Sequence, residues 1–195
     1  MNFLELLKLI NERSDFLEST LLIQNKIFKL HKKDLIILLK QIGTIPESIA
    51  HDFSQEKLYS KITDIILAKS FQELGFQAAV NKERANCADV IIKSFYHNYS
   101  FVADAKVFRL NRTARNQKDF KVKSMSEWKV ENEYAVLDYL FFKYPKKNSQ
   151  IYGQALDSNV CLFSWEHLSF LLEKNIKEKI DLDLSSIWNC SFKIA

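Results

Sequence analysis

The sequence predicts an α/β protein in which a mixed central sheet of about five strands is flanked by helices and preceded by a helical N-terminal region. Two observations support this fold class. Apolar residues recur at helical spacing over most of residues 1–75, whereas residues 76–165 carry short runs rich in β-branched and aromatic side chains. The 195 residues, 47% of them hydrophobic, suffice for one ordinary core. We therefore expect a single domain over residues 1–195, with a helical end over 166–195.

Helical patterns follow one another through the first part of the chain. They cover residues 2–10, residues 15–30 with Ser14 as N-cap, and residues 33–42 and 55–74. Gly43 and Gly75 end the last two helices, because glycine commonly follows a final helical turn. Residues 44–47 are expected to be a linker. Further short helices are predicted over residues 149–156, 165–173 and 183–188.

Strands are predicted over residues 76–80, 89–92, 100–108, 134–142 and 160–164. The second and third can pair as a hairpin around residues 95–98. On the third, Asp104 and Lys106 lie two positions apart and therefore project to the same face. Burying both charges on a core strand costs several kcal/mol unless they pair or coordinate a ligand. The strand therefore marks a candidate site.

An acid followed two positions later by lysine occurs three times: Asp104-Ala-Lys106, Asp119-Phe-Lys121 and Glu127-Trp-Lys129. Only the first lies in an apolar strand; the others lie in a polar stretch that favours a solvated face. The hairpin would bring Asp89 beside Asp104. Two converging carboxylates repel unless a divalent cation lies between them, and all-oxygen ligation favours Mg²⁺. Spacing alone supports equally a structural ion pair, with Asp89 as the first residue of a strand.

Positive charge is concentrated in residues 109–129. Seven Lys or Arg stand there against two acids, a local net charge of +5; because the whole chain carries +4, the remainder carries −1. This distribution favours a localised polyanion site. Next to a Mg²⁺ site it predicts hydrolysis of a nucleic-acid backbone, in which Lys106 orients the attacking water or stabilises developing negative charge.

Several other classes of site are excluded. The three glycines lie too far apart for a phosphate-binding loop or a dinucleotide fingerprint, and the four histidines lack zinc-ligand spacing. The three widely spaced cysteines suggest neither a disulfide framework nor a metal-binding pair, which fits a reducing, cytoplasmic setting. No apolar run approaches the roughly 18 residues of a membrane span, so we expect no membrane association.

Asp89 followed by Asp104-Ala-Lys106 resembles the PD-(D/E)xK nuclease pattern, and residues 102–129 are similar to the HindIII family of type II restriction endonucleases. The similarity continues in IGTIPESI (42–49), QEKLYSKITDIILAKSFQ (55–72), YAVL (134–137) and LFSWEHLSFLL (162–172). The resemblance implies a restriction-endonuclease-like core. It also implies a Mg²⁺-dependent homodimer that cuts double-stranded DNA at a short palindrome, AAGCTT in this family, and a cognate DNA methyltransferase in the same system.

By position, Asp104 and Lys106 match the catalytic acid and lysine of the family, Asp89 the upstream acid, and Asp119 a further carboxylate near the metal. Ala88 stands where the family pattern has proline. Glu56 is either an additional metal-site acid or an acid favoured by the helix dipole at an N-terminus.

For DNA contact, the sequence suggests two groups of side chains. Asn can read adenine and Lys can reach guanine acceptors in the major groove, which suggests Asn116, Lys118 and Lys121. Phosphate contacts are predicted for Arg109, Arg112 and Arg115. Because HindIII-like enzymes continue beyond the point at which this sequence ends, the alternative is a truncated remnant that keeps the nuclease core and only binds DNA.

Overall fold

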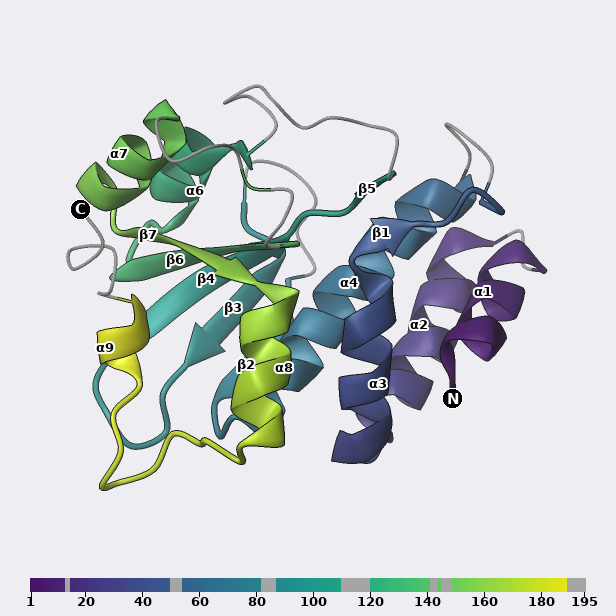
Figure 1. The fold of residues 1–195 in the computed structure, drawn as a ribbon, viewed down its shortest axis with the longest axis horizontal. Helices are drawn as coiled ribbons and strands as arrows, with labels where there is room; N and C mark the ends of the chain where they lie inside the picture. Colours follow the sequence, from purple (N-terminus) through teal and green to yellow (C-terminus); the bar gives the residue numbers. More distant parts are fainter. Residues whose placement is uncertain are drawn as a thin grey trace.

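A computed structural model of the chain describes residues 1–12, 15–49, 54–81, 87–109, 120–140, 144 and 149–188. These residues form a five-stranded mixed sheet with helices on both faces, together with a separate two-stranded pair (Figure 1). The predicted fold class is confirmed. None of the helices in the described ranges is long and apolar enough to cross a membrane.

The helices of the N-terminal region are α1 (Phe3–Asn11), α2 (Phe16–Phe28) and α3 (Lys32–Ile42), and they pack against α4 (Ser54–Glu73). Asp15 begins α2, because its carboxylate accepts the backbone N–H of Glu18 at 2.7 Å. The predicted N-cap, Ser14, lies outside the described residues, and Asp15 takes this role. Helix α4 also packs against the sheet, and every residue from 62 to 71 is buried.

The sheet contains β2 (Gln77–Val80), β3 (Val90–Lys93), β4 (Ser100–Ala105), β6 (Tyr134–Tyr139) and β7 (Val160–Ser164), in the order β2-β3-β4-β6-β7. The β2–β3 and β3–β4 pairs are antiparallel, which confirms the predicted hairpin, and the β4–β6 and β6–β7 pairs are parallel. The predicted strand 100–108 is interrupted after Ala105. It resumes as β5 (Phe108–Arg109), which pairs in parallel with β1 (Thr44–Ile45) inside the predicted linker.

Each face of the sheet is covered by different helices. Helices α4 and α8 (Trp165–Glu173) lie on one face, over a core that includes Phe101 and Ala103 of β4. Helices α6 (Val122–Trp128) and α7 (Gln150–Asp157) cover the other face, where Val102 is buried. A short helix, α9 (Ser185–Trp188), follows near the end of the described chain. Because side chains alternate along a strand, Asp104 lies on the same side of β4 as Val102.

Candidate active site

Three carboxylates converge where β3 and β4 meet α4. Asp64 from α4, Asp89 just before β3 and Asp104 on β4 each offer an oxygen within 4.8 Å of the other two. The hairpin accounts for two of them: Val90 pairs with Ala103, so the next step of the same register sets Asp89 opposite Asp104. Asp64 Oδ1 approaches the end of β4, where it accepts the backbone N–H of Ala105 at 3.4 Å. We call these three residues the carboxylate cluster.

Two lysines neutralise part of this charge. Lys106 Nζ donates directly to Asp104 Oδ2, and the Lys106 backbone N–H donates to the carbonyl of Asp138 at 2.8 Å, which fixes the lysine beside β6. Lys61 Nζ, one helical turn before Asp64 on α4, donates to Asp89 Oδ1 at 3.2 Å. With all five groups ionised, the carboxylate cluster and its two lysines carry a net charge of −1.

The electrostatics of the carboxylate cluster favour a cation. Burial raises the pKa of Asp64 well above its usual value, and the charges of Asp89 and Asp104 raise it further against the opposing effect of both lysines. Burial likewise raises the pKa of Asp104, although Lys106 opposes the shift. A divalent cation between the carboxylates would relieve both the desolvation and the mutual repulsion. The donor set is all oxygen, which suits Mg²⁺.

Asp64 was not predicted from the sequence. It lies in the run Ile62-Thr63-Asp64-Ile65-Ile66, whose apolar residues surround the acid in the middle of a long helix. An ionisable residue embedded in this way needs a partner or a ligand, and that is the signal that could have identified it. The predicted alternative on the same helix, Glu56, lies instead beside Arg109, with a carboxylate oxygen 3.7 Å from the guanidinium.

The structure places Arg109 inside the protein and not at a DNA-binding surface. Its side chain is only 4% exposed, and the guanidinium donates to the carbonyls of Pro46 at 3.2 Å and Ile49 at 2.5 Å. The pairing of β5 with β1 places Arg109 against the segment that precedes α4. The predicted phosphate contact by Arg109 therefore does not fit this geometry.

Lys121 is the other predicted DNA contact within the described residues, and it is exposed. It precedes α6 with a left-handed backbone (φ 46°), and its Nζ lies 5.7 Å from the ring centroid of Trp128. Its charge lowers the pKa of Asp104, which opposes the effect of burial, so its positive potential reaches the carboxylate cluster. The remaining predicted residues, Arg112, Arg115, Asn116, Lys118 and Asp119, lie outside the described residues.

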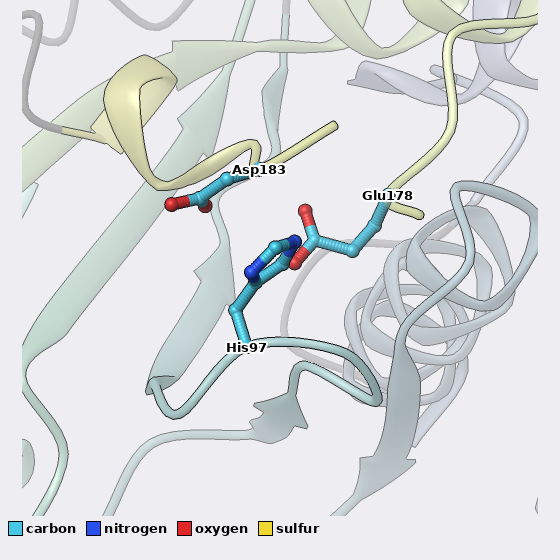
Figure 2. Close-up of side chains that lie close together, drawn as sticks. All are labelled: His97, Glu178 and Asp183. Carbon is cyan, nitrogen blue, oxygen red and sulfur yellow. The ribbon is translucent and has the colours of Figure 1, made fainter. Parts of the chain in front are cut away.

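A second group of possible metal ligands lies at the turn of the β3–β4 hairpin, opposite the end that carries Asp89 and Asp104. His97 comes from the turn between β3 and β4, and Glu178 and Asp183 come from the segment after α8 (Figure 2). Each of the three side chains already has at least one hydrogen-bond partner, and Asp183 accepts the backbone N–H and the hydroxyl of Ser185. Glu178 accepts Ser94 Oγ–H at 2.6 Å, Tyr99 Oη–H at 2.9 Å and the Leu184 N–H at 2.7 Å. His97 Nε2 lies 2.8 Å from the Lys179 carbonyl. This group ties the hairpin turn to the C-terminal segment.

Comparison with known proteins agrees with the geometry. The sequence model of the HindIII restriction endonuclease family matches residues 9–194. A curated relative, the type II restriction enzyme HindIII of Haemophilus influenzae (strain ATCC 51907 / DSM 11121 / KW20 / Rd), is 47% identical over 187 residues. That match covers 95% of this chain and 62% of the length of the relative. The chain therefore belongs to the HindIII restriction endonuclease family.

Proposed function

We propose that this chain is a Mg²⁺-dependent type II restriction endonuclease that hydrolyses phosphodiester bonds of double-stranded DNA at a short palindrome. The observation that carries the proposal is the convergence of Asp64, Asp89 and Asp104 within 4.8 Å, with Lys106 bound to Asp104. Family membership supports the same reaction class, because the curated relative is a type II restriction enzyme.

In this proposal the carboxylate cluster holds the cation, with Asp119 as a further carboxylate near it. Bound Mg²⁺ supplies Lewis-acid polarisation of the phosphodiester and lowers the pKa of bound water. A divalent cation also changes the net charge of the cluster and its two lysines from −1 to +1, which favours a phosphate monoanion. Lys106, held in place by Asp104 and the Asp138 carbonyl, orients the attacking water or stabilises negative charge in the transition state.

DNA contact is assigned to the basic stretch that follows β5. Arg112 and Arg115 are proposed to contact phosphates, and Asn116, Lys118 and Lys121 to contact the major groove. A palindrome is matched most simply by a symmetric homodimer that presents one site to each strand. We propose AAGCTT as the recognition sequence and a cognate DNA methyltransferase as the other component of the system.

Cleavage of a duplex that carries AAGCTT tests the proposal. The purified chain should cut it with Mg²⁺ and be inactive with EDTA. Asp104→Asn and Lys106→Ala should each lower the cleavage rate on the order of a hundredfold or more, the scale of one electrostatic or acid-base contribution. DNA binding should survive in Lys106→Ala, because this lysine acts mainly in the transition state.

Lys123, an exposed residue of α6, provides the control: Lys123→Ala should change the rate only modestly. A protein that binds duplex DNA without Mg²⁺ and cuts none of it would refute the enzyme assignment and support the DNA-binding remnant instead. Light scattering with and without the duplex tests the dimer, and a strict monomer on DNA would contradict it.

A further inference from the structure

We propose that Lys61 is a positioning residue of the carboxylate cluster: it holds Asp89 in the metal-free protein and competes with the divalent cation for that carboxylate. This inference rests on the proposed function for the identity of the cation. The observation behind it is the ion pair between Lys61 Nζ and Asp89 Oδ1 at 3.2 Å, in a protein where Asp89 is one of three carboxylates that converge on one point.

Lys61 lies on a helix, α4, that is firmly packed in the protein. Lys61 and Asp64 lie three positions apart on α4, so both side chains leave the same face of the helix. The residues that follow Lys61, from 62 to 71, are all buried between the sheet and the N-terminal helices. Asp89, in contrast, precedes the first residue of β3 and has a side chain that is 38% exposed. The ion pair therefore fixes the less constrained carboxylate from the more constrained element.

The hydrogen-bond partners of the three carboxylates show where a cation would compete with the Lys61 ammonium. Asp104 is bound by Lys106, Asp89 is bound by Lys61, and Asp64 accepts a backbone N–H from Ala105. A cation ligated by all three must share Asp89 with the Lys61 ammonium, and it also meets the repulsion of that ammonium. Loss of the ammonium leaves the cluster one unit more negative and removes a competitor. Cation affinity should therefore rise when Lys61 is neutralised.

A purely structural role for Lys61 would change cation affinity in the opposite direction. If Lys61 served only to keep the hairpin on α4, its loss would disorder Asp89 and weaken cation binding. The direction of the change in affinity thus separates the two roles. It does so without DNA and without any measurement of cleavage.

Calorimetric titration of the full chain with Mn²⁺, in the absence of DNA, is the test. Lys61→Met keeps the length of the side chain and should lower the dissociation constant about three- to tenfold, the scale of one partly screened ion pair. Lys61→Arg keeps the charge and should bind as the unmodified protein does. Lys57→Met provides the matched control, because Lys57 is an exposed lysine one turn earlier on α4, and it should leave affinity unchanged.

The outcomes separate this inference from the proposed function. If the unmodified chain binds no Mn²⁺, or if Asp104→Asn binds it as well as the unmodified chain, the metal centre itself is refuted. The other case is that the unmodified chain binds Mn²⁺ and Asp104→Asn binds it more weakly. If Lys61→Met then binds Mn²⁺ no more tightly than the unmodified chain while its circular dichroism spectrum is unchanged, only the role of Lys61 is overturned. A rise in affinity shared by Lys57→Met would overturn it too, because the effect would then reflect general surface charge.

Discussion

Replacement of Asp64 by asparagine should stabilise the metal-free protein at neutral pH and abolish most of its stabilisation by Mg²⁺. Asparagine keeps the shape of the side chain and its acceptor for the Ala105 N–H. The substitution removes a buried carboxyl group whose pKa is raised by burial and by the charges of Asp89 and Asp104. Two unit charges 4.8 Å apart repel by about 3.5 kcal/mol at an effective dielectric constant of 20. Because the two lysines offset part of this repulsion, we expect a gain of about 1–2 kcal/mol.

The pH dependence of this gain has a definite sign. The folded-state pKa of Asp64 lies above its unfolded value of about 3.9, so its contribution to stability is complete below that value and is lost as pH rises through the folded pKa. The difference between Asp64→Asn and the unmodified protein should therefore be larger at pH 8 than at pH 5. Mg²⁺ at a hundred times its dissociation constant should stabilise the unmodified protein by about 2.7 kcal/mol, and the variant by much less.

Urea unfolding of both proteins at pH 5 and pH 8, each with EDTA and with Mg²⁺, measures the free energy of unfolding under all four conditions. The exposed Asp181 provides a control, since Asp181→Asn should change neither the stability in EDTA nor the response to Mg²⁺. An Asp64→Asn protein that is less stable than the unmodified one in EDTA and keeps the full response to Mg²⁺ would refute the assignment of Asp64 to the metal centre.

Two other buried charged groups give separate predictions. Arg109→Met leaves the carbonyls of Pro46 and Ile49 without their donor, so it should lower the free energy of unfolding by about 3 kcal/mol, measured by urea denaturation; a change below about 0.5 kcal/mol would contradict the buried role. Asp138 is fully buried, and within the part of the chain that the structure describes neither of its carboxyl oxygens has a partner of acceptable hydrogen-bond geometry. Burial and the charge of Glu166 raise its pKa, although the Tyr139 backbone N–H opposes the shift. The unmodified protein should therefore lose up to about 1.4 kcal/mol per pH unit from this group as pH rises above its unfolded pKa, and thermal melts should show that Asp138→Asn removes that part of the loss; identical pH profiles would refute it.

The strands of the central sheet and two of the three residues of the carboxylate cluster follow from local patterns. Residues 100–105 are mostly apolar around Asp104, and a hairpin with its turn around residues 95–98 is enough to bring Asp89 and Asp104 together. The same reasoning predicts that Lys106 projects beside Asp104, where the structure places it. Local sequence is informative here because the period of a strand and the length of a turn fix which residues face one another.

Asp64 and Arg109 depend on contacts that no local pattern contains. Helix α4 is buried around its circumference over residues 62–71, so its sequence has no polar face from which the direction of Asp64 could be deduced. Arg109 stands first in a basic run, and the sequence pattern therefore predicts a phosphate contact for it as for the arginines that follow. Its burial results from the pairing of residues 44–45 with residues 108–109, a contact between distant segments that each contribute only two residues to the ladder.

The hydrogen bonds of Arg109 also couple the unfolding of two regions that the sequence presents as separate. Figure 1 shows β5 beside β1, and the Arg109 guanidinium connects the strand that follows β4 to the segment that leads into α4. If the N-terminal helices opened alone, a buried guanidinium would lose its acceptors while β4 stayed folded, and such a state is costly. The N-terminal helices and β4 should therefore exchange their amide hydrogens as one cooperative unit.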